Sequence, residues 1–351
     1  MRAQIQSQPD ALEALLARHD EIRATAGVAA AGARRLWATG HGDSYFAPLA
    51  AADVFRRYAG VPYQPLLAQE LAAYPPADLG PDDLVIVLSA SGAVGASVAA
   101  ARVARTRGAR VLAVTNAPAS PLAREADRVV ALGIAEPAPF LAGTVTYTAS
   151  LLVLMLLAVV PDSAPAGDLR AAVAALPAAL ALEGAIRGAV GAHAPTAIWH
   201  VLGMGCQEAT ARYGAAKLVE VADIVGIAHE TEEFFHEHHW VVRTEQPVVL
   251  VAHDAPSSQR AAAAALHLHE LGVPVWLVGG APGGDVHLSL PEVAPWASPL
   301  VAAVPLQWLA YWAARARGLD PDRRSHLRGS ARYEVSRKYR YGTPPGARRD
   351  A

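Results

Sequence analysis

Cysteine and lysine are scarce in this chain, and each shortage limits its chemistry. Among 351 residues there is one cysteine, Cys206, so no disulfide can form within the chain. A protein without disulfides suits a reducing compartment, and we therefore expect a cytoplasmic location. Lysine occurs only at Lys217 and Lys338. Any reaction that needs a lysine amine consequently has two candidate residues.

Long apolar runs and an excess of charge are also missing. The most apolar run, 151–160, ends at Pro161 and is shorter than the about 20 residues that span a bilayer, so it predicts a core helix. No basic-then-apolar segment opens the chain, and we expect no secretory signal peptide. The formal net charge of −2 gives no support to nucleic-acid or membrane binding. We therefore expect no nucleic-acid partner and no membrane.

Apolar residues are plentiful and are arranged for a parallel sheet. They make up 53% of the chain, against 18% charged residues, and the length suits two domains of roughly 150 residues each. Short apolar runs at 84–88 and 109–115 are typical of strands buried on both faces, and a helical segment separates them. This pattern predicts an α/β fold.

The same pattern occurs twice along the chain. A GHG turn at 40–42 corresponds to a GMG turn at 203–205, an offset of 203 − 40 = 163. Gly108 and Gly272, each just before a buried strand, repeat at nearly the same offset, 272 − 108 = 164. We therefore predict two copies of one α/β domain. The predicted parts are a helical arm (1–32), a first domain (33–161), a linker with one long connecting helix over 169–190 (162–192), a second domain (193–320) and a tail (321–351).

Two loops at predicted strand ends carry glycine and hydroxyl residues. Ser89-Ala90-Ser91-Gly92 follows the strand at 84–88 and precedes an Ala- and Arg-rich helix. A loop at a helix N-terminus favours anions, although a plain capped helix start is the simpler interpretation of an isolated serine turn. The turn at 40–42 lacks the third glycine of a dinucleotide fingerprint, which argues against NAD. The second copy has HDAP at 253–256 in place of the serine loop.

Six short motifs occur in order along nearly the whole chain: IQSQP at 5–9, GHGDSY at 40–45, AGVP at 59–62, SASG at 89–92, GAAKLVE at 214–220 and VPLQWLAY at 304–311. Together they resemble the sugar isomerase (SIS) family, in the double-SIS form of the isomerase half of glucosamine-6-phosphate synthases. The resemblance implies two tandem SIS domains, each a doubly wound five-stranded parallel sheet, acting without cofactor or metal. It implies a sugar or sugar-phosphate substrate and a homodimer with a shared active site. No glutaminase domain is included, so we expect no glutamine hydrolysis.

The resemblance implies three catalytic residues: Glu220, His236 and Lys217. A carboxylate can move a proton between the two carbons of an aldose–ketose pair, and a histidine can help open the sugar ring near neutral pH. The family likeness implies that His236 acts in the neighbouring subunit's site. Two alternatives stay open, since Lys217 either holds a substrate hydroxyl or pairs with Glu220 on one helix face. The His- and Glu-rich segment at 228–239 lacks a His-Glu-x-x-His metal pattern, and we expect no metal there.

The implied substrate site departs from the family pattern at two positions. Asp43 and Val94 stand where the family has threonines, and a carboxylate at 43 would repel a phosphate unless it is protonated or points away. We therefore hypothesise altered anion recognition, with a non-phosphorylated polyol or aminosugar as substrate. The candidate substrate-binding residues are Gly42, Asp43, Ser44, Ser89, Ser91, Gly92, Val94 and Thr144.

The predicted function is enolisation of a sugar, aminosugar or sugar phosphate, by an aldose–ketose isomerase or a fructosamine-type deglycase or deaminase. The family's Schiff-base lysine corresponds to Gly329 here, which disfavours amination through that lysine. Two alternatives remain, a non-catalytic sugar-binding or regulatory protein and an aminotransferase-like enzyme that uses external ammonia.

Overall fold

Two separate parallel sheets organise residues 1–135, 142–280 and 282–341, which this computed structural model describes. The first sheet has the strand order β2-β1-β3-β4-β5 and the second β10-β9-β8-β6-β7. Read from its other edge the second order is β7-β6-β8-β9-β10, so corresponding strands occupy corresponding places. The predicted fold class is confirmed. The strands are β1 Arg35–Gly40, β2 Tyr63–Leu67, β3 Asp83–Leu88, β4 Arg110–Thr115, β5 Arg128–Ala131, β6 Ile198–Gly203, β7 Val225–Glu230, β8 Val248–Ala252, β9 Val275–Gly279 and β10 Val286–Leu288.

The repeat extends to the backbone of the two glycine turns. β1 and β6 begin and end at one common offset, since 198 − 35 and 203 − 40 are equal. Gly42 and Gly205 both have positive φ, 54° and 60°, which favours glycine. A Cβ on Gly40 would lie 2.3 Å from the Ser44 carbonyl oxygen, so only glycine lets the following helix pack this closely on the strand end.

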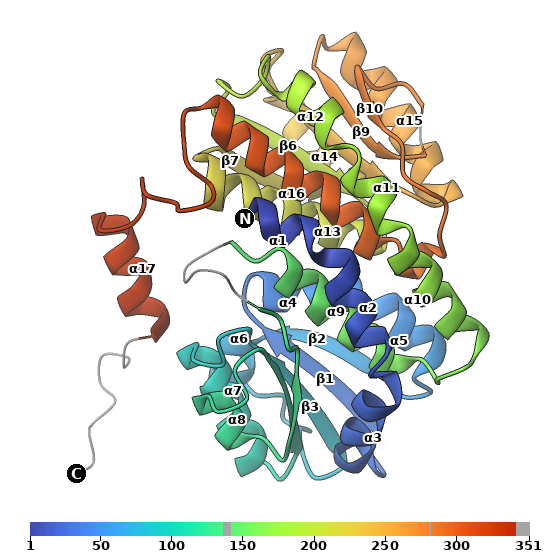
Figure 1. Ribbon diagram of the computed structural model, residues 1–351, viewed down its shortest axis with the longest axis vertical. Coiled ribbons are helices and arrows are strands. Elements are labelled where there is room, and N and C mark those ends of the chain that lie inside the picture. Colours follow the sequence, from blue (N-terminus) through green and yellow to red (C-terminus); the bar gives the residue numbers. More distant parts are fainter. Residues whose placement is uncertain (136–141, 281, 342–351) are drawn as a thin grey trace.

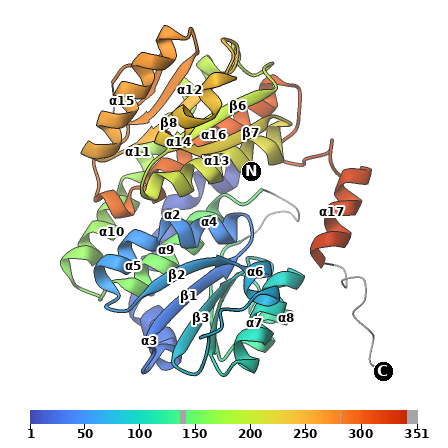
Figure 2. The ribbon, with the colours of Figure 1, turned by 180° about the vertical axis from the view of Figure 1, so that it is seen from behind.

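Helices cover both faces of each sheet (Figures 1 and 2). Every residue of β3 is buried, as expected for a central parallel strand covered on both sides. The helices of the arm and first unit are α1 Arg2–Gln6, α2 Gln8–Leu16, α3 His19–Ala30, α4 Asp43–Ala50, α5 Ala52–Tyr58, α6 Ala68–Ala73, α7 Gly95–Thr106, α8 Pro121–Glu125 and α9 Val145–Ala158. Those that follow are α10 Ala164–Ala174, α11 Leu176–Leu180, α12 Glu183–Val190, α13 Cys206–Ala222, α14 Thr231–His236, α15 Ala255–Glu270, α16 Pro299–Ala316 and α17 Ala331–Tyr341, with short 3₁₀ turns η1 His238–Trp240 and η2 Pro295–Ala297.

The single connecting helix predicted over 169–190 is wrong. The chain there forms three helices, α10, α11 and α12, separated at Ala175 and at 181–182. Pro177 explains the first break, because proline lacks the N–H that would continue α10 and its ring clashes with a carbonyl one turn earlier. The second break contains no proline.

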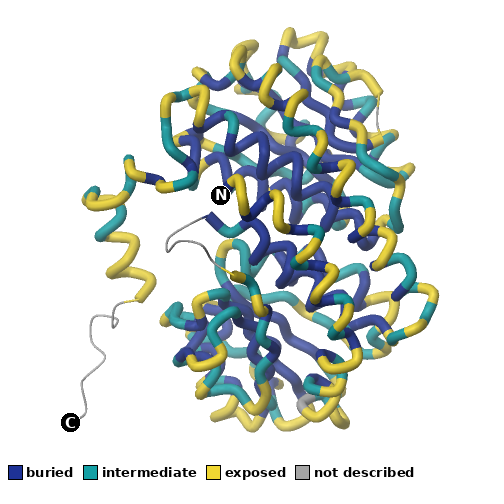
Figure 3. The backbone as a smooth tube through the Cα atoms, in the orientation of Figure 1, coloured by how far each residue is buried: buried dark blue, intermediate teal, exposed yellow. Residues whose placement is uncertain are grey.

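The main core lies where the two units meet (Figure 3). The apolar run predicted to be a core helix is α9, and all its residues except Leu157 are buried. In that core α9 and α4 of the first unit pack with α13 and α16 of the second. We call this tightly packed junction between the two units the seam.

The N-terminal arm is tied into this seam by a buried amide network. Gln8 Nε2 donates hydrogen bonds to the Ile5 carbonyl at 2.9 Å and to Gln307 Oε1 on α16 at 2.8 Å. Thr148 Oγ1 on α9 donates to Gln8 Oε1 at 2.8 Å. One side chain of the arm thus links helices of both units.

Among the described residues, no single helix combines the length and apolar composition that a membrane span needs. The bent pair Ala164–Leu180 and Glu183–Val190 reaches that length and composition only when its two parts are taken together. The tail helix α17 has no buried residue. It lies beside the body of the molecule near α7 (Figures 1 and 2).

Candidate functional site

Both glycine- and serine-bearing loops lie at one edge of the first sheet. β1 and β3 are hydrogen-bonded neighbours that run parallel, so their carboxyl ends lie at the same edge. The segment 41–44 follows β1 and Ser89–Gly92 follows β3. Ligands of open α/β sheets bind at this edge. Helix α13 of the second unit packs against α4, the helix that begins in the first loop.

An ion-pair chain crosses the seam at this point. Lys217 Nζ donates to Asp43 Oδ2 at 2.8 Å and to Glu220 Oε2 at 2.7 Å. The Lys217 side chain is 0% exposed, and 174 residues separate it from Asp43. Glu220 is three positions after Lys217 on α13, on the same helix face. Two carboxylates share one ammonium, so the group has a net charge of −1 when both are ionised.

The buried setting changes the protonation of this group. Burial raises the pKa of Asp43 to about 6, Lys217 opposes that rise, and Glu220 adds to it. Burial alone would lower the pKa of Lys217, but the attraction of Asp43 and Glu220 outweighs burial and raises it. Lys217 is therefore an ammonium at neutral pH. Because the Asp43 side chain retains 22% exposure, its ionisation costs less than that of a fully enclosed carboxylate.

Some buried polar side-chain atoms of the first unit have no hydrogen-bond partner within the described part of the chain. Among the described residues, Asp43 Oδ1, Thr144 Oγ1 and the Tyr147 hydroxyl are buried and unpaired. A Cβ on Gly143, next to Thr144, would lie 2.2 Å from Asp43 Oδ2, which shows how closely this backbone approaches the carboxylate. An unpaired buried polar group costs about 1–3 kcal/mol.

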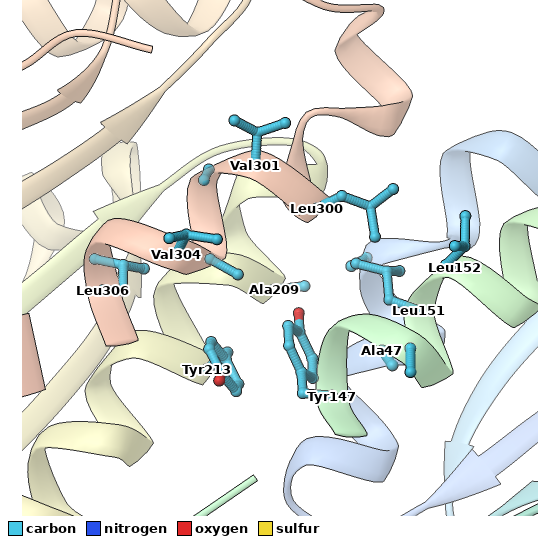
Figure 4. Packing of buried hydrophobic residues seen from close by; sticks show 14 of the residues in the cluster. Ala47, Tyr147, Leu151, Leu152, Ala209, Tyr213, Leu300, Val301, Val304 and Leu306 are labelled. Carbon is cyan, nitrogen blue, oxygen red and sulfur yellow. The ribbon is translucent and has the colours of Figure 1, made fainter. Parts of the chain in front are cut away.

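Two stacked tyrosine rings pack beside the ion pairs. Tyr147 on α9 and Tyr213 on α13 lie 3.8 Å apart between ring centroids, with an interplanar angle of 11°. Figure 4 shows the two rings side by side beneath the apolar side chains of α16. Tyr213 donates a hydrogen bond to the Gly143 carbonyl at 2.8 Å, and Lys217 Nζ lies 5.1 Å from the Tyr213 ring centroid. These rings exclude water from the underside of the lysine.

The serine loop hydrogen-bonds mainly to itself. Ser89 Oγ accepts from the Gly92 N–H at 3.1 Å, and Ser91 Oγ accepts from the Ala93 N–H at 3.3 Å. Ser89 is buried and Ser91 is exposed. The following helix, α7, begins at Gly95 with Val94 as its N-cap. The sequence predicted that the serines form the helix N-terminus, but they precede it by about one turn. Val94 has no side-chain acceptor for the first helical N–H groups.

The SIS domain family matches residues 31–160 and 200–315, more than half of the chain. The chain belongs to the SIS domain family. Curated relatives include glutamine–fructose-6-phosphate aminotransferases (isomerizing). The one from Zymomonas mobilis is 30% identical over 311 residues, 84% of this chain and 51% of the relative. The one from Pyrobaculum aerophilum is 30% identical over 93% of this chain and 56% of the relative. This SIS chain thus spans about half the length of these relatives.

Solved structures share the SIS fold over most of their length. The C-terminal domain of glucosamine-fructose-6-phosphate aminotransferase from Francisella tularensis has a TM-score of 0.80 at 22% identity, covering 90% of this chain and 96% of that one. Tagatose-6-phosphate ketose/aldose isomerase from Escherichia coli has a TM-score of 0.73 at 21% identity, covering 90% and 92%. Glucosamine-6-phosphate deaminase from Thermotoga maritima has a TM-score of 0.74 at 23% identity, covering 92% and 98%. At these identities the likeness concerns the fold.

His236 is not joined to the ion-pair chain within this SIS subunit. Its side chain is 67% exposed at the end of α14, and its Nε2 lies 3.5 Å from Glu232 Oε1. No hydrogen bond or ion pair connects it to Lys217 or Glu220 in the described part of the chain. The role implied for His236 in a neighbouring subunit's site stays a prediction.

Three other histidines, His200, His229 and His238, lie close to one another. His200 on β6, which sequence analysis did not single out, has Nδ1 3.2 Å from His229 Nε2. The rings of His229 and His238 are 4.0 Å apart. Burial, followed by the neighbouring His238 and His200, lowers the pKa of His229 to about 4, so it is neutral at pH 7. In the described residues no group of three or more His, Cys, Asp and Glu side chains could hold a metal ion.

Arg324, which no sequence pattern indicated, contacts helix α13. Its guanidinium donates to the Glu220 carbonyl at 2.8 Å, and the residue is 8% exposed. The only signal was its place in an Arg-rich tail. Cys206 occupies the position in the second copy that Asp43 has in the first, since 206 − 43 equals the offset between the glycine turns. Burial raises the pKa of its thiol to about 12, so it remains protonated.

Two surface cavities lie elsewhere. One, of about 400 Å³, is lined by Arg35 and Asp83 at the start of β1 and β3, where an Arg35–Asp83 ion pair of 2.9 Å stabilises the loops. The other, of about 460 Å³, lies between α2 and α10. The first is at the amino edge of the sheet, opposite the edge that binds ligands in such folds. We therefore place the candidate site at the ion-pair chain.

Proposed function

We propose that this SIS protein is an enzyme that enolises a sugar, as an aldose–ketose isomerase or a fructosamine-type deglycase or deaminase. The observation that carries the proposal is the position of Glu220. Its carboxylate is held 2.7 Å from a buried ammonium, at the edge of the sheet where the glycine and serine loops end. Relatives whose names include isomerase, aminotransferase and deaminase activities support a sugar-directed reaction in general.

In the proposed reaction Glu220 is the base that acts on carbon. It takes the proton from the carbon next to the carbonyl, and the C–H electron pair forms the C=C bond of an enediolate. Lys217 stabilises the negative charge that develops, which is effective because the lysine is removed from water. Returning the proton to the neighbouring carbon moves the carbonyl by one position. Gly42, Ser44, Ser89, Ser91 and Gly92 would line the sugar site.

The proposal includes a homodimer in which His236 serves the partner's site. The homodimer is supported by exposed apolar side chains close to the exposed His236 in the chain. Trp240 and Val241 are 78% and 68% exposed. Large apolar side chains exposed together often mark an interface. A histidine there could shuttle hydroxyl protons during ring opening.

The test follows carbon-bound protons by NMR in heavy water. Wild type should exchange the proton at C1 or C2 of its substrate for deuterium, in a panel of free and phosphorylated ketoses, aldoses and aminosugars. Glu220→Gln should lower that rate on the order of 100-fold, the usual contribution of a general base. Glu208→Gln, a partly exposed carboxylate paired with Arg212 at the start of the same helix, is the matched control and should exchange normally.

Two outcomes would overturn the enolisation proposal. Absence of exchange with every sugar, together with measurable binding, would indicate a non-catalytic sugar-binding protein. Turnover that requires added ammonium would indicate an aminotransferase-like enzyme.

A further inference from the structure

We propose that three histidines, His200, His229 and His238, hold the segment 231–240 against the second sheet near neutral pH and release it in mild acid. We call these three residues the histidine cluster. The segment contains α14 and η1, and α14 ends at His236. The release does not depend on any reaction, whereas its effect on catalysis rests on the proposed function.

The histidine cluster joins the segment to two neighbouring strands. His200 lies on β6 and His229 on β7, and His200 Nδ1 lies 3.2 Å from His229 Nε2. The ring of His238, which belongs to the segment, has its centroid 4.0 Å from that of His229 and 6.1 Å from that of His200. The three imidazoles therefore meet where the segment packs on the sheet.

Few other buried side chains fix the segment. Of the α14 residues, Thr231 and Phe234 are buried, and η1 has no buried residue. The centroid of the Phe234 ring lies 5.4 Å from those of both His200 and His229. A segment with few buried contacts opens at a low cost in free energy. Its attachment to the sheet therefore depends strongly on the histidine cluster.

Protonation removes the contact between the two strand histidines. A neutral imidazole has one N–H donor and one acceptor nitrogen, so the hydrogen bond between His200 and His229 forms only while one ring offers an acceptor. When both rings are protonated, two N–H groups face each other at 3.2 Å and two positive charges repel. Even the first charge is unfavourable, because His200 is only 2% exposed.

The pKa shifts of these histidines agree with that geometry. Burial lowers the pKa of His229 to about 4, and His238 and His200 add to the lowering. Burial also lowers the pKa of His200, while a hydrogen bond with Gln246 opposes the change and His238 adds to it. Opening returns His229 toward its ordinary pKa of about 6.5, so the open state binds more protons than the attached state. Attachment is consequently most stable above about pH 6.5 and weakens as the pH falls toward about 4.

Nearby carboxylates compensate this charge only weakly. Glu237 Oε2 lies 3.6 Å from His238 Nδ1, but its side chain is 66% exposed, so water screens the attraction. Glu232 is paired with Arg260 of α15 and with His236. Within the described part of the chain, no carboxylate lies within ion-pair distance of the two strand histidines. The other titratable groups on the elements packed here are Glu230, Glu233, His239 and His267.

The experiment measures amide hydrogen exchange of the full-length protein by mass spectrometry at pH 5 and pH 8, with rates corrected for the intrinsic pH dependence of exchange. Peptides that cover 231–240 should open about 10- to 30-fold more often at pH 5, the linkage expected when one histidine regains its ordinary pKa on opening. Peptides of the buried strand β3 should not change, which excludes global unfolding.

Three variants assign this pH ratio to the histidine cluster. His229→Gln should lower the ratio to about threefold or less, because it removes the group with the pKa of about 4. His238→Gln, at a side chain that is 32% exposed and therefore tolerates change, should also lower it. His267→Gln, on α15 with a 60% exposed side chain, is the matched control and should keep the wild-type ratio.

The outcomes separate this inference from the proposed reaction. A wild-type ratio near one would overturn the inference, as would a ratio that neither His229→Gln nor His238→Gln lowers, and both results leave enolisation intact. Deuterium exchange into the sugar should weaken less in acid in His229→Gln than in wild type, because His236 then stays in place. If no sugar exchanges at any pH, enolisation fails, and the amide exchange ratio still decides the role of the histidine cluster.

Discussion

At the scale of single residues, Asp43 alters the chemistry that we expect of the whole candidate site. The carboxylate of Asp43 stands where the SIS resemblance implies a hydroxyl for phosphate, and it captures the lysine that accompanies the proposed base. From the sequence alone, Asp43 suggested a phosphate site that had lost a hydroxyl and gained a repelling carboxylate. In the structure it is a partner of Lys217 across the seam between two units. Its charge is therefore compensated in part, and it can be retained without unfolding the loop.

Lys217→Met tests how much this compensation contributes. The variant leaves Asp43 and Glu220 facing each other without a cation, and breaking a buried ion pair typically costs about 3–5 kcal/mol. We expect a loss near the lower limit, because both carboxylates are partly exposed. The folded-state pKa of Asp43 should rise further, so the folded state binds more protons than the unfolded state. The free energy of unfolding should consequently fall as pH rises from 5 to 8.

Urea denaturation at pH 5 and pH 8 measures this difference. The double variant Lys217→Met/Asp43→Asn, which removes the stranded charge, should recover most of the stability at pH 8. An equal loss at both pH values would show that lost packing, not charge, dominates the effect of the lysine.

At the scale of elements, helix α13 is placed by a close contact with α16. A Cβ on Gly214 would lie 2.6 Å from Leu306 Cδ1 and 3.2 Å from its Cβ. Gly214→Ala should therefore move the helix that carries Lys217 and Glu220. Overpacking costs about 1–3 kcal/mol, and the gain in helix propensity offsets up to about 1 kcal/mol of it. We expect a net loss of about 1 kcal/mol, with slower enolisation.

Gly188→Ala on α12 is the matched control for this prediction. Nothing lies within 4 Å of a Cβ at Gly188, so the alanine should stabilise the protein by about 0.4–1 kcal/mol. Thermal unfolding of both variants, with deuterium exchange rates, measures the contrast. Equal stabilisation by the two alanines would contradict the proposed role of the α13–α16 contact.

The helices and strands also show which parts of the fold could be predicted from the sequence and which could not. The strands and glycine turns follow from local patterns, because a buried parallel strand and a positive-φ glycine depend on neighbours along the chain; the offset between β1 and β6 is the same at both ends. The connecting segment could not be divided correctly, since its alanines favour helix throughout and only Pro177 signals a break. The Asp43–Lys217 pair joins positions 174 apart. No local pattern predicts such a contact.

At the scale of the whole molecule, the seam that holds the two units together also assembles the candidate site. The ion-pair chain exists only when the two units are docked, and the docking is fixed by a shared core and by the arm that Gln8 anchors. The catalysis proposed for Glu220 should therefore depend on residues of the arm that do not contact the ion-pair chain.

Gln8→Ala is the direct test of that dependence. Gln8 is 0% exposed and bonds to Gln307 and Thr148; its removal leaves the Gln307 amide without this partner, which should cost about 1–3 kcal/mol. Gln6→Ala, two residues away on the exposed side of the arm, should cost less than about 0.5 kcal/mol. Circular dichroism and tryptophan fluorescence should report one shared unfolding transition for wild type and both variants, because the core spans both units. Two separate transitions in wild type would mean that the units fold independently, and the arm could then not act on Glu220 through the seam.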